Sequence, residues 1–463
     1  MNEVVAPGTP RRVEVIFPPT QTGGLFAEGP ESLVEFRGQL AFAANFEDGT
    51  RALWTSDGTE AGTFAVKTLP VESPALGIRM EHLTPAGERL FFTAGESVHG
   101  NELWVSDGTP SGTGLVADLT PGPGHSYLTG LTALGSTLTF FRTLLATETT
   151  PERTELWRSD GTASGTVRLR DFGAGTSVGW QTGRADDVLV FFVTGDSGGT
   201  AVWRTDGTAA GTQVLRSFPG TPVGYGVADV NSAGRLTFFS LPEPDDSTSV
   251  WKTDGTRAGT VRLYTFAPDG RYPRMLTALG DHLYVSLTSA AEQRAALFRL
   301  RVDGVGGKEH VVTLPNPYAD QQDAWPYISS FTTTGGRLFF ELAIGSSGPA
   351  PRDTQLWVTD GTKAGTRLLR RPLSLSDEYG SPIVAAGADS GLVFFAAYDG
   401  TSGIEPWVTD GTVAGTRLLK DVAPATRSSY PREYLRVGDQ LFFSAFDDTE
   451  AGQLWTVPLL SGP

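Results

Sequence analysis

The sequence predicts an all-β fold: a closed β-propeller of nine four-stranded blades, with eight blades as the alternative. Three observations predict it. One phrase of about twelve residues recurs nine times, each copy lies in a unit of roughly 50 residues, and each unit contains four short runs typical of strands. The 57 Gly and 30 Pro suit many strands joined by turns better than helices.

The recurring phrase marks the units. It reads ELWVSDGTPSGT from Glu102, and an aromatic residue at its third position anchors the copies. These anchors are Trp54, Trp104, Trp157, Trp203, Trp251, Phe298, Trp357, Trp407 and Trp455. The predicted units are approximately 32–70, 80–120, 128–172, 183–218, 229–266, 273–315, 329–372, 383–422, and 432–458 plus 8–17, within one domain, 1–463. One Trp at a fixed point of every unit indicates a core between blades.

Within the unit at 80–120, four strands are expected in order. They are His82–Ala86, Arg89–Thr93, Glu102–Ser106 and Gly114–Leu119. The second strand carries adjacent phenylalanines, Phe91 and Phe92, and such pairs recur in later units. Neighbouring residues of a strand point to opposite sides of the sheet, so each sheet must be covered on both faces. Sheets packed around an axis satisfy this requirement, whereas a linear stack leaves two apolar ends.

The two ends of the chain complete each other. The last unit stops after its third strand, Gln453–Val457, and the N-terminal segment Arg11–Phe17 resembles the fourth strand of other units. We therefore expect the N-terminal strand to complete the last blade and close the ring, which removes exposed sheet edges.

Charge and composition exclude several partners. Lys and Arg total 36 against 52 Asp and Glu, giving a net charge of −16, so neither nucleic acid nor an anionic membrane surface is expected as a partner. No apolar run is long enough to span a bilayer, and no membrane insertion is expected. There is no Cys. The N-terminus shows no signal peptide, so the protein is either cytoplasmic or a mature form.

The phrase ELWxxDGTxxGT resembles the bacterial ELWxxDGT repeat family, and the resemblance covers nearly the whole chain. Phe298 in place of Trp, and Gly306-Gly307 in place of Gly-Thr, depart from the pattern in the sixth unit only. The resemblance implies a propeller-like repeat protein of the cell envelope or exterior. It implies no particular activity.

The Asp-Gly-Thr turns are interpreted as structural. An Asp side chain can accept hydrogen bonds from the backbone two residues on, and the following Gly can take a positive φ. The alternative is a calcium ion at each turn, although each turn offers one carboxylate where calcium needs six to eight oxygens. The aspartates concerned are Asp57, Asp107, Asp160, Asp206, Asp254, Asp360 and Asp410.

A second aromatic set lies in the connections between units. Because strand directions alternate, these connections share one face of a propeller, where rings with a polar group would suit a glycan or a peptide. The alternative is that each ring fills a gap between blades. The candidate ligand-binding residues are Tyr127, Trp180, Tyr225, Tyr272, Trp325, Tyr327, Tyr379 and Tyr430. The divergent connection 314–329 is the expected place for specificity.

Catalytic residues form no recognisable constellation. GDSGG at 195–199 resembles a protease nucleophile segment, but it lies in an expected Gly-rich hairpin without a histidine segment to supply a base. The five histidines are scattered, so we predict neither catalytic residues, nor a metal site, nor a cofactor.

The sequence thus favours a non-catalytic binding or scaffold protein, monomeric, outside the cell or in its envelope, that contacts a glycan, peptide or protein. A cytoplasmic location stays open. The rivals are a polysaccharide hydrolase or lyase with carboxylates in the central channel, and a purely structural spacer.

Overall fold

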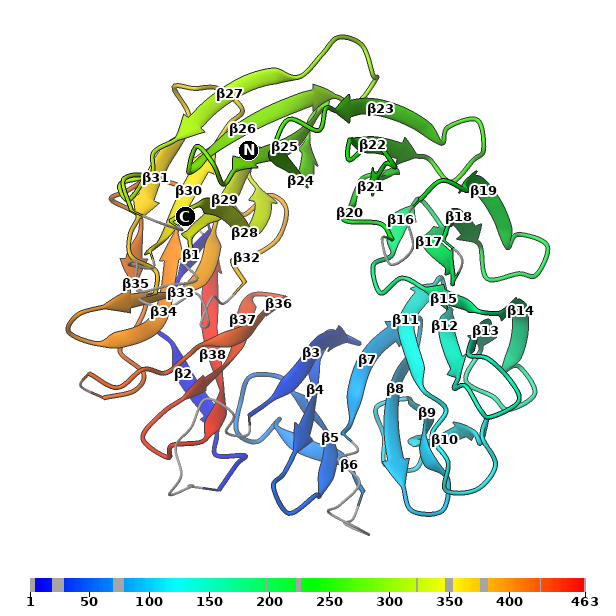
Figure 1. Cartoon of the computed structure of the whole chain (residues 1–463). Helices are drawn as coiled ribbons and strands as arrows, with labels where there is room; N and C mark the ends of the chain where they lie inside the picture. The colour runs from blue at the N-terminus through cyan, green and yellow to red at the C-terminus, as the bar shows by residue number, and fades with distance from the viewer. Residues whose placement is uncertain are drawn as a thin grey trace.

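A computed structural model describes residues 5–18, 29–69, 79–196, 198–221, 226–321, 324–345, 353–374, 382–424 and 426–461. Within these residues the chain forms 38 β-strands and no α-helix, and the strands make nine sheets. The sheets follow one another in chain order around a ring (Figure 1). The prediction of a nine-bladed β-propeller is confirmed, and the alternative of eight blades is wrong. No helix in the described part of the chain could cross a membrane.

Eight blades are each continuous in the sequence. Blades 1 to 3 contain β3 (Glu31–Phe36), β4 (Gln39–Asn45), β5 (Arg51–Ser56) and β6 (Phe64–Leu69); β7 (Glu81–Ala86), β8 (Arg89–Glu96), β9 (Gly100–Ser106) and β10 (Gly114–Ala117); and β11 (Leu128–Leu134), β12 (Thr137–Leu144), β13 (Arg153–Ser159) and β14 (Val167–Ala174). Blades 4 and 5 contain β15 (Thr176–Val178), β16 (Gly183–Ala185), β17 (Val188–Gly195), β18 (Thr200–Thr205) and β19 (Gln213–Phe218); and β20 (Val230–Ala233), β21 (Leu236–Pro242), β22 (Thr248–Thr253) and β23 (Val261–Phe266). Blades 6 to 8 contain β24 (Arg271–Leu279), β25 (His282–Ser289), β26 (Arg294–Arg301) and β27 (Glu309–Leu314); β28 (Pro326–Thr334), β29 (Arg337–Ile344), β30 (Asp353–Thr359) and β31 (Arg367–Arg370); and β32 (Val384–Ala385), β33 (Val393–Asp399), β34 (Gly403–Thr409) and β35 (Arg417–Leu418).

Blade 9 joins the two ends of the chain. It contains β36 (Arg432–Val437), β37 (Gln440–Phe446) and β38 (Gly452–Ser461), together with β1 (Val5–Pro7) and β2 (Arg11–Glu14). β2 pairs antiparallel with β38, where Arg12 lies opposite Trp455, just as Leu115 of β10 lies opposite Trp104 in blade 2. The predicted closure by the N-terminal strand is therefore confirmed. β1 adds a further pairing at the end of β38.

The paired part of the closing strand is shorter than the expected Arg11–Phe17. The backbone N–H groups of Ile16 and Phe17 donate to Oε1 of Gln453, at 2.9 and 3.2 Å, instead of to a strand. The Gln453 amide in turn donates to the carbonyl oxygen of Phe17 at 2.7 Å. The Gln453 side chain therefore holds the N-terminal segment where the pairing of β2 with β38 ends.

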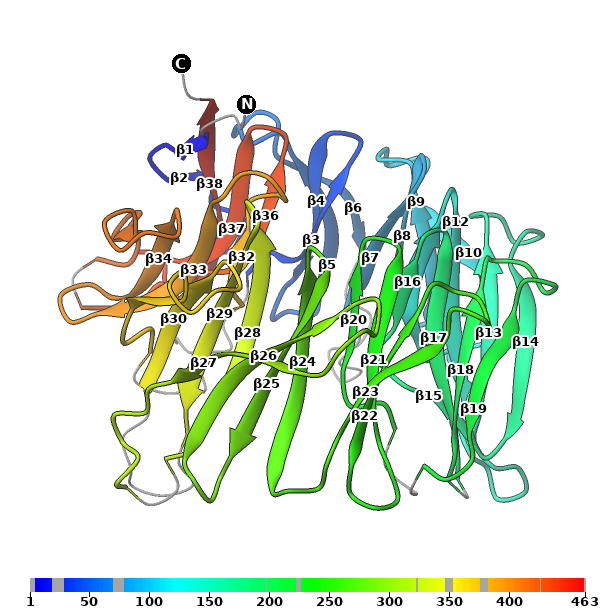
Figure 2. The same cartoon turned by 90° about the horizontal axis from the view of Figure 1, so that it is seen from above.

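The alternating strand directions give the ring two different faces. In blade 2, the β7–β8 hairpin and the Asp107 turn between β9 and β10 lie on one face. The β8–β9 hairpin and the connection to blade 3 lie on the other. We call the first the turn face and the second the connection face. The first strands of most adjacent blades contact each other, and they are the innermost strands of the ring (Figure 1). Figure 2 shows the same ring from its side, with the strands running between the two faces.

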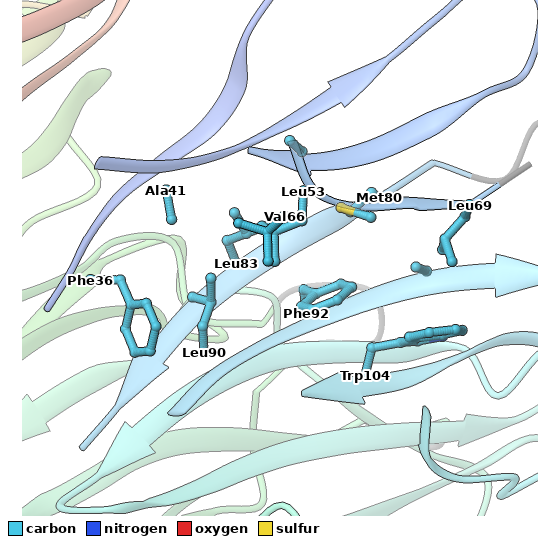
Figure 3. Close-up of a cluster of buried hydrophobic side chains, with 12 residues drawn as sticks. Phe36, Ala41, Leu53, Val66, Leu69, Met80, Leu83, Leu90, Phe92 and Trp104 are labelled. Atoms are coloured by element: carbon cyan, nitrogen blue, oxygen red, sulfur yellow. The ribbon is translucent and has the colours of Figure 1, made fainter. Parts of the chain in front are cut away.

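The cores lie between the blades. Phe92 of β8 packs with Leu53 and Leu69 of blade 1 in one cluster (Figure 3), while the adjacent Phe91 belongs to the cluster between blades 2 and 3. The Trp104 ring stacks on Phe92 with centroids 6.3 Å apart. Adjacent phenylalanines thus serve opposite faces of one sheet, as the sequence predicts.

Basic side chains extend these cores. Thirteen residues after the anchor of one blade, a cation lies over the Trp of the next blade: Arg170 over Trp203, Arg216 over Trp251, Arg370 over Trp407 and Lys420 over Trp455, at 5.0, 4.5, 3.5 and 5.4 Å from the ring. Such contacts add attraction between blades that hydrophobic packing alone does not provide.

Candidate functional site

The structure brings three of the predicted aromatic residues together. Tyr272, Trp325 and Tyr327 line one pocket with a volume of ≈ 490 Å³ between blades 6 and 7, on the connection face. We call it the aromatic pocket. Its lining residues are Tyr272, Pro273, Arg274, Ser286, Thr288, Ala290, Trp325, Tyr327 and Ile328.

One wall comes from the two inner strands of blade 6. In the β24–β25 ladder, Tyr272 lies opposite Thr288 and Arg274 lies opposite Ser286. Residues two apart on a strand share a face, so these four side chains project together towards blade 7. Below them, Tyr284, Phe340 and Leu342 form the buried core between the two blades.

The opposite wall comes from the connection into blade 7 and the start of β28. The rings of Trp325 and Tyr327 have centroids 5.6 Å apart and planes at 44°. Nδ2 of Asn316 donates to the Gln293 carbonyl at 2.9 Å and to the Ala324 carbonyl at 2.7 Å. The connection is thereby fixed to the β25–β26 hairpin one residue before Trp325.

The rings remain accessible. Tyr272 is 68% exposed and Trp325 is 40% exposed, while Tyr327 is half-buried. A core ring would have lost most of its solvent contact. The exposure of Tyr272 and Trp325 therefore argues against the alternative that these rings fill gaps between blades.

Arg274 and the adjacent Met275 connect blade 6 to both neighbouring blades beside the pocket. Its guanidinium donates to the backbone carbonyls of Ile328 and Ser329 in blade 7. Next to it, Asp229 of blade 5 accepts the N–H of Met275 at 2.9 Å. Burial raises the pKa of Asp229, and the charge of Arg274 acts in the opposite direction. The Arg274 cation is thus held by backbone oxygens and faces a carboxyl group.

Ser286 lies buried in the pocket lining. Its side chain is fully buried, and its hydroxyl has no hydrogen-bond partner among the described residues. A buried hydroxyl without a partner is uncommon in folded proteins. This group could donate to, or accept from, a molecule in the pocket.

The remaining predicted residues lie elsewhere. Tyr127 and Tyr430 precede the first strands of blades 3 and 9, with φ of 47° and 44°. Trp180 is 89% exposed in the segment between β15 and β16, two short strands that both pair with β17 in blade 4. Tyr225 and Tyr379 lie outside the described residues.

Two of these separate tyrosines have aromatic neighbours. The rings of His125 and Tyr127 meet edge to face with centroids 6.0 Å apart, and those of Tyr430 and Phe446 meet similarly at 6.3 Å. Neither tyrosine lines the aromatic pocket.

The glutamate of the repeat phrase positions the connections, a role that the sequence interpretation missed. Glu405 accepts hydrogen bonds from the N–H of Val422 at 2.8 Å and the hydroxyl of Ser429 at 2.7 Å. Glu102 accepts equivalent bonds from Leu119 and Ser126. Each serine lies 24 residues after its glutamate and directly before Tyr127 or Tyr430, a spacing that the sequence does contain.

The Asp-Gly-Thr turns form closed hydrogen-bond systems. In blade 2, Oδ1 of Asp107 accepts the Thr109 N–H at 2.9 Å and the Thr109 hydroxyl at 2.7 Å, and the hydroxyl bond lowers the pKa of Asp107. The same pair of bonds occurs at Asp57, Asp160, Asp206, Asp254, Asp360 and Asp410. In the described part of the chain, no three His, Cys, Asp or Glu side chains gather as a metal site would require.

The turns also join neighbouring blades. Arg37 of blade 1 donates to the Asp107 carbonyl at 2.7 Å, and Arg11 of blade 9 donates to the Gly58 carbonyl at 2.6 Å. Likewise, Arg367 of blade 7 donates to the Gly411 carbonyl at 2.7 Å. Backbone carbonyls of these turns therefore take part in contacts between blades.

The carboxyl groups with the largest pKa changes are internal. Burial raises the pKa of both Glu341 and Glu405 to about 7. Their side chains are 3% and 0% exposed, and neither lines the aromatic pocket. The GDSGG segment forms the predicted hairpin between β17 and β18, where the Gly198 N–H donates to the Gly195 carbonyl at 2.9 Å. Its Ser197 lies outside the described residues.

No protein-family model matches this chain, and neither does any curated protein. Similar solved structures include a prolyl endopeptidase, at 12% identity and a TM-score of 0.45, over 83% of this chain and 55% of that one. An oligogalacturonate lyase is 12% identical with a TM-score of 0.41, over 70% and 86%. The propeller domain of a protease from Pyrococcus furiosus is 11% identical with a TM-score of 0.38, over 72% and 94%. The chain spans about half the length of the prolyl endopeptidase, and these similarities concern the fold alone.

Proposed function

We propose that this protein is a non-catalytic binding protein of the bacterial cell envelope or exterior, which holds a glycan, peptide or protein on its connection face. The aromatic pocket supports this proposal best. Three aromatic side chains from two consecutive blades line a single concave site, and such sites are where ligands bind. The repeat phrase, with its resemblance to bacterial envelope repeats, supports the location.

The arrangement of polar groups favours binding over catalysis. The aromatic pocket has one charged side chain among its described lining residues, Arg274, and no carboxylate. Glycoside hydrolysis needs two carboxyl groups that flank the substrate bond. The two carboxyl groups whose pKa rises most, Glu341 and Glu405, are enclosed by protein instead.

The test is a screen of the purified chain on glycan and peptide arrays, in millimolar calcium and again in chelator. The variant Tyr272→Ala/Trp325→Ala removes the two exposed rings of the pocket. Phe64→Ala is the matched control, since Phe64 is a 50% exposed ring on the outer strand of blade 1. We expect calcium-independent binding that the double variant loses and the control retains.

Three results would count against the proposal. Shortening of any bound polysaccharide during the assay would favour the hydrolase or lyase. Failure to bind on either array would rule out the glycan and peptide ligands and favour a protein partner or the structural spacer. Binding that requires calcium would instead assign the ligand to the Asp-Gly-Thr turns.

A further inference from the structure

We infer that the aromatic pocket is a subsite for one neutral hexopyranose ring of a glycan chain. This inference rests on the proposed function, because it names the ligand class of the same site. Three properties of the pocket support it: its aromatic walls, its unpaired hydroxyl and its charge.

The walls suit the apolar faces of a sugar ring. A pyranose presents C–H groups on its two faces and hydroxyl groups around its edge, so it needs an aromatic surface and a polar group placed at the side. Tyr272 from β24 and Trp325 from the opposite connection supply accessible rings on two sides of the pocket. Large, rigid side chains of this kind contribute contact area with little loss of side-chain freedom.

The hydroxyl of Ser286 supplies the polar group. It is buried and lacks a partner among the described residues, and Thr288 lies two residues further along the same strand face. A sugar hydroxyl can both donate and accept, so it can pair with a serine hydroxyl in either direction. An apolar ligand would leave Ser286 unpaired, which is unfavourable in a buried place.

The charge of the pocket favours a neutral ligand. Arg274 is the charged side chain among the described lining residues, and its guanidinium already donates to the Ile328 and Ser329 carbonyls. The whole chain carries a net charge of −16, which repels polyanions such as polyuronates. The described lining also lacks a carboxylate to hold a basic peptide side chain.

A proline-rich peptide is the main competitor. Such peptides also lie on aromatic side chains, but they run along an extended groove between rings. Here the walls come from two facing blades, and the partnerless group is one serine hydroxyl in the lining. A single ring that is inserted edge-on fits this shape better.

The experiment is a calorimetric titration of the full chain with five probes. These are neutral oligosaccharides of glucose, galactose and mannose, an oligogalacturonate and a proline-rich peptide. We expect a neutral oligosaccharide to bind, and saturation-transfer NMR to show contact at the C–H protons of one residue of that sugar. Tyr272→Ala should weaken binding about tenfold, and Ser286→Ala roughly two- to tenfold.

Controls separate this inference from the proposed function. Phe64→Ala should bind as the unchanged chain does, and circular dichroism should show that every variant keeps its β structure. If only the peptide or the uronate binds, the sugar assignment is wrong while the binding function stands. If a neutral glycan binds but depends on Tyr127 or Tyr430 and not on Tyr272, the pocket is not its subsite. If no probe binds, the sugar assignment is wrong, and the array screen decides whether the binding function stands.

Discussion

Single residues explain why the repeat phrase is so regular. In each Asp-Gly-Thr turn the aspartate carboxylate fills the space beside the second glycine of the phrase. A Cβ atom on Gly112 would lie 2.1 Å from Oδ1 of Asp107, which is far closer than atoms can approach. The phrase therefore requires Gly at that position, because the aspartate carboxylate leaves no room for a Cβ atom.

We predict that Gly112→Ala destabilises the protein by about 1–2 kcal/mol, because Asp107 must give up its bonds to Thr109. Gly114→Ala is the control two residues away. A Cβ there meets no atom within 4 Å, so its effect should stay within about 0.5 kcal/mol. Urea unfolding of both variants measures the difference. Equal destabilisation of the two would contradict the role assigned to Asp107.

A second prediction concerns pH and the buried Glu341. Burial raises its pKa from an ordinary value of 4.5 to about 7, so the folded state binds this proton more tightly than the unfolded state does. The contribution of this group to stability is thus greatest below pH 4.5, falls by about 1.4 kcal/mol per pH unit between pH 4.5 and pH 7, and levels off above pH 7. The turn aspartates with a lowered pKa, such as Asp107, act only in more acidic solution.

Glu341→Gln isolates this effect, because the amide keeps the shape of the side chain but does not ionise. We expect the variant to lose less stability than the unchanged chain between pH 4.5 and pH 7. Guanidinium unfolding at a series of pH values measures both. If the two curves run parallel, Glu341 is not the group that titrates.

At the scale of single elements, β2 and the residues directly after it matter most for the closure of the ring. Val13, Ile16 and Phe17 belong to the core between blades 9 and 1, and Phe17 is fully buried against Phe46 at a centroid distance of 4.8 Å. The N-terminal segment thus both pairs with β38 through its backbone and forms one side of the core between blades 9 and 1.

We predict that deletion of residues 1–17 costs on the order of 5 kcal/mol, since three large side chains lose their burial. It also exposes the edge of β38, so the shortened chain should self-associate. Thermal unfolding and light scattering measure these effects, and a peptide covering residues 5–17 should restore the original behaviour. Val15→Ala serves as a control, since Val15 is 44% exposed. A monomeric deletion variant with unchanged melting would contradict the closure.

For the whole molecule, the regular features could be predicted from the sequence. The phrase around Trp104 marks each third strand, and the pair Phe91-Phe92 requires two covered faces, because these features depend on spacing within one unit. Strand ends were predicted less exactly: β7 begins at Glu81, one residue before the expected His82, but β8 ends at Glu96, three residues after the expected Thr93. The ninth blade followed from comparing the two ends of the chain.

The site was only partly predictable, because it depends on contacts between units. The aromatic residues could be named, but Tyr272, Trp325 and Tyr327 meet only because β24 and the connection into blade 7 face each other. The buried hydroxyl of Ser286 gives no sequence signal, since many strands contain serine. The roles of Glu102 and Glu405 were likewise hidden, although their 24-residue spacing to Ser126 and Ser429 is visible once the bonds are known.

The closure of blade 9 also determines when the ring can form during synthesis of the chain. Arg12 and its partner Trp455 are 443 positions apart in the chain. At the usual speed of a ribosome, roughly 20 to 90 seconds separate their appearance. Throughout that time β2 is already made but has no strand to join, and the nascent ring stays open. The closure of the ring therefore waits until β38 has been synthesised, whatever the other eight blades have already done.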